Sequence, residues 1–216
     1  MTYTIKCMKL DLLLLKPYLK SIILVLLVPL LITFFTGTLF EGLSFAATVM
    51  AMTTGYTFSI AEKNNLDRFY GFLPAKRNTL ILSRYLVIFL MGFAALIFTL
   101  LVQLVILNFK VTAPSFQEIV GSFLLCAVLF CIYAGVQIPG YYRFGSIKGK
   151  MFMFIPTVGF LLFYYLVKLF TDNTVNQDLN LLPSNTILII CTVGLIALIM
   201  AVSISVSTRI VEKNKH

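Results

Sequence analysis

The chain has 216 residues, of which 60% are hydrophobic, and its formal net charge is +9. With a mean hydropathy of +0.99, it is too apolar to be a soluble domain, and no hydrophilic segment is long enough to form a second one. We therefore expect one membrane-embedded domain, residues 1–216.

Charged residues are absent from six long windows, each close to or above the roughly 17–25 residues that a helix needs to cross the hydrocarbon core. The sequence thus predicts an all-α polytopic membrane protein with six transmembrane helices. These predicted spans cover about residues 20–40, 42–61, 85–108, 119–139, 151–170 and 185–208.

Residues 1–19 precede the first span and are amphipathic. Apolar residues recur at intervals of three and four, and lysines recur in the same way on a neighbouring face. The apolar set is Ile5, Met8, Leu12, Leu15 and Leu19, and the basic set is Lys6, Lys9, Lys16 and Lys20. This pattern predicts an interfacial helix that lies in the membrane surface and ends near Pro17. The alternative is that this segment is only the start of the first span.

The first two predicted spans are separated by a single charge, Glu41, so the turn between them must be very tight. Pro29 lies inside the first span and predicts a kink there.

The longest polar stretch is residues 62–84, between the second and third spans. Asn64 or Asn65 can cap a short helix over residues 66–70, and Gly71 can end it. Pro74 then begins a helix that continues into the third span. A short capped helix with aromatic residues in such a loop is typical of a docking element for a soluble partner.

The remaining elements are read in the same way. A short loop with Lys110 and Glu118 follows the third span, and the fourth span ends near Pro139. A basic loop with Arg143, Lys148 and Lys150 comes next. After the fifth span, residues 171–184 are either a plain loop or a segment that dips back into the membrane.

Basic residues fall almost entirely on one side of this arrangement. If both termini are cytoplasmic, all 17 Lys and Arg residues lie inside except Lys110 and Lys168. This bias predicts a multi-pass protein of the cell membrane with its N- and C-termini in the cytoplasm. The basic surface is then expected to meet anionic lipids, and not nucleic acid.

Residues for catalysis or metal binding are missing from the predicted spans. The only histidine is His216, and no C-x-x-C motif is present. Residues 145–151 resemble a phosphate-binding loop, but the glycines are one residue too close and Met151 replaces the Ser or Thr that holds magnesium. We therefore expect no enzyme activity, no metal and no ATP site in this chain.

No acid or base lies inside the charge-free windows, whereas ion-coupled carriers and channels usually keep such groups in their spans. Gln103 and Gln137 are the strongest polar groups in the spans, and we expect them to form interhelical hydrogen bonds. If the protein transports anything, its energy is expected to enter from outside the spans, through the cytoplasmic loop.

Three short motifs carry a family resemblance. Glu62-Lys63, the run Leu73-Pro74-Ala75-Lys76-Arg77, and Ser83-Arg84-Tyr85 resemble the pattern between the second and third spans of small permeases of the type-2 ABC exporter class. In that class the run forms a coupling helix and the start of the third span. The motifs cover residues 62–85, and Arg84 stands where Lys is common.

The resemblance implies a mechanism and a set of partners. Two permease subunits, identical or related, would sit on two cytoplasmic ABC ATPase subunits, and ATP and magnesium would bind to those partners. The residues implied to contact the ATPase are Glu62, Asp67, Arg68, Phe69 and Tyr70. Those implied to anchor the start of the third span are Pro74, Lys76, Arg77 and Arg84. Bacterial members export amphipathic peptides, peptide antibiotics or lipid-linked molecules.

Two other functions remain open from the residues alone. The chain could be a non-transport membrane anchor or assembly protein that recruits a cytoplasmic partner, or it could be an ion-coupled carrier. The first would bind its partner without moving a solute, and the second would transport alone under a cation gradient.

Overall fold

The computed structural model describes residues 2–66, 77–110, 114–173 and 185–213. In this part of the chain every regular element is helical, which confirms the all-α prediction. The α-helices are α1 (Thr2–Leu15), α2 (Leu19–Thr36), α3 (Leu39–Lys63), α5 (Arg77–Phe109), α6 (Phe116–Gly149), α7 (Phe154–Asn173) and α8 (Asn185–Lys213). Two 3₁₀ turns, η1 (Lys16–Tyr18) and η2 (Lys150–Met153), join α1 to α2 and α6 to α7.

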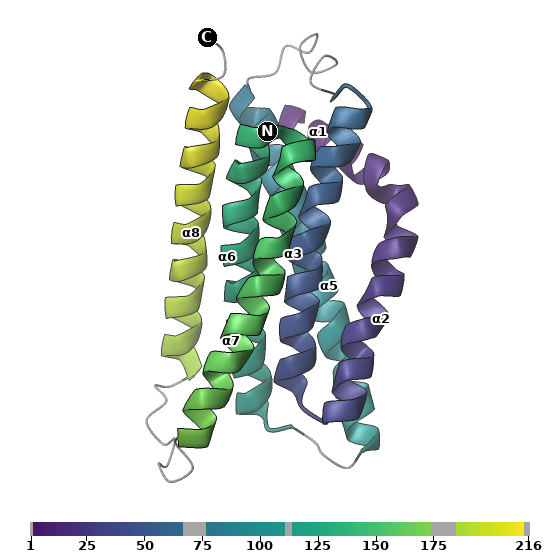
Figure 1. Cartoon of the computed structure of the whole chain (residues 1–216), viewed down its shortest axis with the longest axis vertical. Coiled ribbons are helices and arrows are strands. Elements are labelled where there is room, and N and C mark those ends of the chain that lie inside the picture. Colours follow the sequence, from purple (N-terminus) through teal and green to yellow (C-terminus); the bar gives the residue numbers. More distant parts are fainter. Residues whose placement is uncertain (1, 67–76, 111–113, 174–184, 214–216) are drawn as a thin grey trace.

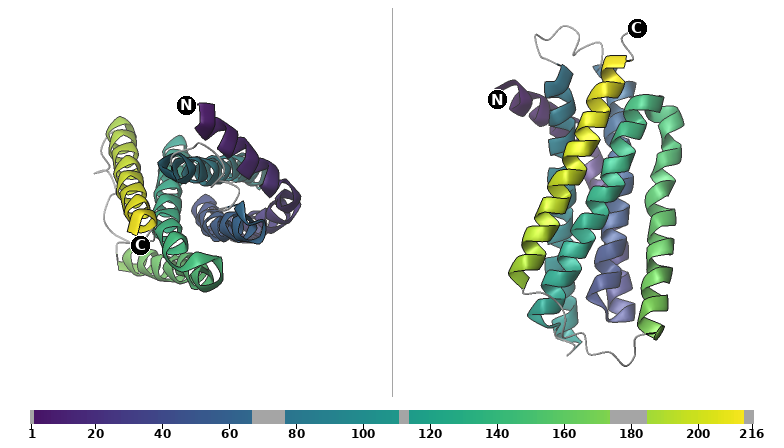
Figure 2. Two further views of the ribbon diagram at one scale, coloured as in Figure 1. Left: turned by 90° about the horizontal axis from the view of Figure 1, so that it is seen from above. Right: turned by 90° about the vertical axis from the view of Figure 1, so that its left-hand side faces the viewer.

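The long helices lie side by side, with α3 in the middle (Figure 1). Helices α2, α5, α6 and α7 pack around α3, and α8 packs on the outside against α6 and α5 (Figure 2). Helix α1 crosses one end of the bundle, where α3 and α8 end and α5 begins. We call this the basic end, because the helix ends and the α6–α7 turn there carry Lys63, Arg143, Lys148, Lys150 and Lys213.

Within the described ranges, four helical stretches are long and apolar enough to cross a membrane: Thr4–Thr36, Asn78–Phe109, Phe116–Leu162 and Ile189–Lys213. This finding supports a multi-pass membrane protein. The six-span count, the cytoplasmic position of the termini and the two alternatives for residues 171–184 stay predictions.

Helix α3 is the least apolar of the long helices because it is surrounded by the others. Its buried positions include small and hydroxyl residues such as Gly42, Ala47, Thr48 and Gly55. Small residues let helix backbones approach closely, so α3 can contact four neighbours at once. Lipid does not have to cover such a helix, and high hydropathy is therefore not required of it.

Helix boundaries differ from the predicted spans at the basic end. Helix α5 is described from Arg77 onward, well before the third predicted span, as expected for a helix that continues into that span; its predicted start at Pro74 lies outside the described residues. Helix α6 continues through Pro139 to Gly149, interrupted only at Gly145, so the basic loop predicted after Pro139 is wrong. Charge marks where a chain leaves lipid, whereas a helix can continue into water as long as its backbone hydrogen bonds persist.

Helix α1 packs with part of the predicted apolar face, because Leu15 is buried and Met8 and Leu12 pack beside it, but the packed face also includes Cys7 and Asp11 and leaves Ile5 out. Cys7, Asp11 and Leu15, each one turn apart, are buried, while Ile5 is 62% exposed. The reason is that α1 packs against α5 and α3, so protein contacts select its inner face. An interfacial position and binding to anionic lipids stay predictions.

The turn between α2 and α3 is as tight as expected. It consists of Gly37 and Thr38, and Gly37 adopts the left-handed conformation (φ 73°) that ends α2. Glu41 lies just past the turn, in the first turn of α3, where the helix dipole favours an acid.

The two buried glutamines have different outcomes. The Gln137 amide nitrogen on α6 donates to the Phe152 carbonyl of η2 at 3.0 Å, which confirms an inter-element hydrogen bond. The Gln103 amide on α5 has no hydrogen-bond partner among the described residues, so the same prediction is wrong there.

Candidate functional site

Of the predicted coupling loop, residues 62–84, the structure describes the two ends. Glu62 and Leu66 lie at the end of α3, and Arg84 lies in α5. Arg77 begins α5, but its side chain is outside the described residues. So are Asp67, Arg68, Phe69, Tyr70, Pro74 and Lys76, on which most of the predicted ATPase contacts and span anchors fall.

The end of α3 is built by two asparagines. Asn64 is its last half-helical residue and donates its side-chain amide to the Ile60 carbonyl at 2.9 Å. Asn65 adopts a left-handed conformation (φ 50°), which asparagine tolerates better than most residues. These residues therefore end α3, while the short helix over residues 66–70 that they were predicted to cap lies outside the described residues beyond Leu66. Leu66 then packs in an apolar cluster with Cys7 of α1 and Ala61.

Glu62 connects the end of α3 to the α6–α7 turn. Its carboxylate accepts a hydrogen bond of 2.9 Å from the backbone N–H of Ser146. The residue before, Gly145, has φ 74° and ψ −179°, and this break in α6 frees the Ser146 N–H from the helical pattern. A carboxylate at such a free N–H acts like a helix N-cap.

The same contact sets the charge of Glu62. Hydrogen bonds from the side chain and then the backbone of Ser146 hold the pKa of the Glu62 carboxyl below its ordinary value of 4.5. Glu62 is therefore ionised at neutral pH, in spite of its small desolvation.

Arg84 lies two turns inside α5 and is only 9% exposed. Its guanidinium lies over the Phe58 ring of α3 at 5.2 Å and over the Tyr142 ring of α6 at 5.9 Å from the ring centres. These distances are within the range of cation–π interactions. Arg84 thus joins α5 to α3 and α6, which suits an anchor at the start of the third predicted span.

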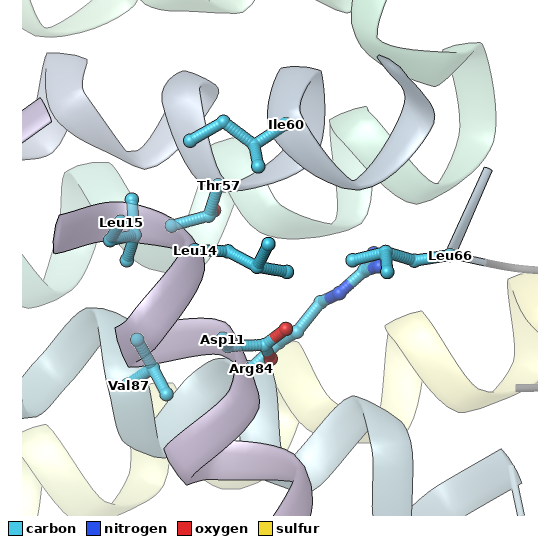
Figure 3. Close-up of a pocket in the computed structure, with 8 residues that line it drawn as sticks. All are labelled: Asp11, Leu14, Leu15, Thr57, Ile60, Leu66, Arg84 and Val87. Atoms are coloured by element: carbon cyan, nitrogen blue, oxygen red, sulfur yellow. The ribbon is translucent and has the colours of Figure 1, made fainter. Parts of the chain in front are cut away.

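Asp11 brings α1 into the same cluster. It is 8% exposed, and its carboxylate and Arg84 reach into one small pocket (Figure 3). The space in this pocket is ≈ 10 Å³, about what one water molecule requires. The pocket is therefore too small to hold a substrate. We call this place, where Asp11 of α1 lies beside Arg84 of α5, the Asp11–Arg84 joint.

Reading the sequence missed Asp11, Tyr142 and Ser146 as parts of this site. For Asp11 a signal existed, because it is the only acid in the first 40 residues and lies one turn from both Cys7 and Leu15. Tyr142 and Ser146 carried no comparable signal, because their roles depend on the break at Gly145.

The arrangement is a set of contacts between helices. Among the described residues, no group of three or more His, Cys, Asp or Glu side chains could hold a metal ion. What the geometry offers is a set of fixed contacts between the ends of the coupling loop and the helices α1, α3, α5 and α6.

Comparison with known proteins agrees with this architecture. The family described as ABC-2 family transporter protein matches residues 8–212, whereas no curated protein and no solved structure matches the chain. That family consists of membrane permease subunits that work with separate ABC ATPase subunits. The match covers nearly the whole sequence, and the chain is therefore a membrane permease of the ABC-2 transporter family.

Proposed function

We propose that this permease exports an amphipathic peptide or a lipid-like molecule from the cytoplasm, driven by ATP hydrolysis in its partner ATPase subunits. Two permease subunits, identical or related, would form the membrane part. Each would have its basic end in the cytoplasm and its termini on that side. The loop of residues 62–84 would dock on the ATPase.

The observation that carries this proposal is the way in which both ends of the loop are fixed. On the side of α3, Glu62 holds the α6–α7 turn and Leu66 packs against α1. On the side of α5, Arg84 contacts α3 and α6. A displacement of the loop by an ATPase would therefore reach α1, α5 and α6 together.

The composition of the predicted spans supports the use of ATP. Their charge-free windows contain no acid or base that could bind a coupling proton or sodium ion. A carrier driven by an ion gradient would need such a group, and an anchor would not need the buried Asp11–Arg84 joint that ties α1 to α5.

Reversing the charges in the centre of the loop tests the proposed docking. In the variant D67K/R68E we expect the stimulation of the ATPase by the permease to fall by roughly tenfold, as for one side of an interface charge pair. The thermal unfolding of the permease should not change. The matched control is Lys213→Glu, at the exposed end of α8, which should leave stimulation intact. Normal coupling in D67K/R68E would count against the docking role.

A further inference from the structure

A stripe of polar side chains runs along the face of α6 that meets η2 and α7. Tyr133, Gln137 and Tyr141 follow each other at one-turn intervals and are 6%, 0% and 2% exposed. Eight residues of α-helix correspond to about 12 Å. The stripe therefore extends over a considerable part of the membrane thickness.

At this seam, large side chains pack directly against glycines. A Cβ at Gly159 of α7 would lie 2.8 Å from the Tyr133 ring, and one at Gly140 would lie 2.9 Å from the Phe152 ring. The Tyr141 hydroxyl packs on Gly55 of α3, where a Cβ would lie 2.5 Å from it. The seam is thus closely packed, through flat rings placed on glycines and not through interlocked branched side chains.

Several polar atoms at the seam have no hydrogen-bond partner among the described residues, although they are buried. They are the Gln137 carbonyl oxygen, the Tyr141 hydroxyl and the Thr157 hydroxyl of α7. Buried polar groups almost always have partners, and a group without one is destabilising. Separation of η2 and α7 from α6 would break the bond from Gln137 to Phe152, but it would open the Gln137 carbonyl, the Thr157 hydroxyl and, beside Met153 of η2, the Tyr141 hydroxyl to new partners.

Helix α7 is placed to separate in this way. Its opposite face is apolar and exposed, with Phe154 67%, Val158 56% and Leu161 61% exposed. It is connected to α6 through η2 and the break at Gly145, and Figure 2 shows α6 and α7 as a hairpin at the basic end. Glu62 holds Ser146, directly after that break, so the residue that precedes the coupling loop is bonded to the base of the hairpin.

We propose that the seam between α6 and α7 opens about Gly145 and that the stripe then binds uncharged hydrogen-bonding groups, amides or hydroxyls, of an amphipathic substrate. This inference rests on the proposed export function and specifies where and how the substrate is recognised. Tyr133 provides an aromatic surface, while Gln137, Tyr141 and Thr157 provide neutral donors and acceptors.

The chemistry of the stripe explains the choice of an uncharged ligand group. None of its members carries a charge, and an ammonium, carboxylate or phosphate placed there would lose its hydration without an opposite charge. An amide or hydroxyl matches the free carbonyl of Gln137 and the hydroxyls of Tyr141 and Thr157, each of which can pair with such groups.

Removing single hydroxyls tests the binding role. The permease and its ATPase are placed in vesicles, and ATPase stimulation is measured with a synthetic Leu/Ser amphipathic peptide with blocked ends, with an uncharged glycolipid, and with phosphatidylglycerol. In Tyr141→Phe and Thr157→Val, the probe concentration for half-maximal stimulation should rise by about tenfold. Thermal stability should not fall, because neither hydroxyl has a partner in the closed seam.

The matched control is Thr54→Val. The Thr54 hydroxyl is also buried and without a partner, but it faces the space between α1, α2 and α5, away from α7. This variant should respond to the probes like the wild type. Comparing the responses to the peptide and to the glycolipid distinguishes amide ligands from hydroxyl ligands. Equal responses in all variants, or stimulation by phosphatidylglycerol alone, would overturn the proposed binding site.

Fastening α7 to α3, against which α6 also packs, tests whether α7 must move for the seam to open. The Phe45 ring of α3 and the Phe160 ring of α7 meet at 5.6 Å between centres, so F45C/F160C can be joined by a short bis-maleimide. The background is Cys191→Ser, because the other three native cysteines are buried. ATP-dependent movement of a fluorescent form of the peptide should be lost on cross-linking, and F45C alone should be unaffected by the reagent.

The outcomes separate the two proposals. If the wild-type complex transports and the locked variant transports equally well, the opening of the seam is refuted and the export function stands. If the wild-type complex moves none of the probes with ATP, the export function and the inference that depends on it both fail.

Discussion

Helices α2 and α5 approach α3 closely at Gly42, whose side chain is a single hydrogen atom. A Cβ at this position of α3 would lie 1.9 Å from the Thr33 hydroxyl of α2 and 2.5 Å from the Gln103 amide of α5. It would also lie 3.0 Å from the Pro29 carbonyl, a backbone atom that cannot move aside easily. Glycine at this position therefore determines how closely α2 and α5 approach α3.

Gly42→Ala should lower the free energy of unfolding by about 1–3 kcal/mol, the usual loss for overpacking. Gly121→Ala in α6 is the matched control, because no atom lies within 4 Å of its added Cβ. The control should stabilise by about 0.5–1 kcal/mol, since alanine is the better helix former. Thermal unfolding in detergent measures both, and equal effects would show that the three helices do not meet as described.

Glu62 allows a second test at single-residue resolution. Glu62→Ala removes both hydrogen bonds to Ser146 and should destabilise by at most about 1 kcal/mol, with Glu62→Gln in between. Because the folded pKa lies below the ordinary value, the stabilisation is fully present above pH 4.5 and is lost as the pH falls through the lowered pKa. Melting curves should therefore show a contribution from Glu62 that stays constant between about pH 6 and 8. A wild-type-minus-alanine difference that grows in that range would contradict the contact.

At the scale of elements, hydropathy and charge predicted the long helices but not their inner faces. Helix existence follows from apolar length, which is visible in the sequence. The face of α1 does not, because Cys7 and Asp11 are selected by contacts with α3 and α5 that no local pattern records. The continuation of α6 past Pro139 was missed for a similar reason. The helix is interrupted by the backbone conformation of Gly145, which no sequence pattern marks.

Helix α1 offers a direct test of such a contact. Asp11→Asn leaves the buried Arg84 guanidinium beside a neutral group, and we expect a loss of roughly 3 kcal/mol in unfolding free energy. Lys9→Gln, on the exposed face of α1, should change stability by less than about 0.5 kcal/mol. The exchange D11R/R84D should recover part of the loss. If Asp11→Asn and Lys9→Gln were indistinguishable, α1 would not be held through this joint.

At the scale of the whole molecule, family and general architecture could be predicted, whereas the site could be predicted only in part. The motif of residues 62–85 indicated the transporter class, and the match over residues 8–212 establishes it. Glu62 and Arg84 were identified from the motif, but their partners Ser146 and Tyr142 come from the distant helix α6. Contacts of that kind depend on packing between helices of similar composition, where lipid and protein neighbours select the same side chains.

The architecture also explains where energy enters. Because the charge-free windows of the predicted spans contain no acid or base, we expect the energy to come from outside the membrane part and not from an ion gradient. Its fixed joints, Glu62 with Ser146 and Arg84 with Tyr142, connect the basic end to the seam between α6 and α7. ATPase partners at the basic end would then supply the motion.

Transport by purified components tests this account most directly. The permease is placed in sealed vesicles either alone under a proton or sodium gradient, or with its ATPase and ATP, and uptake of a labelled amphipathic peptide is followed. Movement only with the ATPase and hydrolysable ATP is the expected result. Movement by the permease alone under a cation gradient would contradict it.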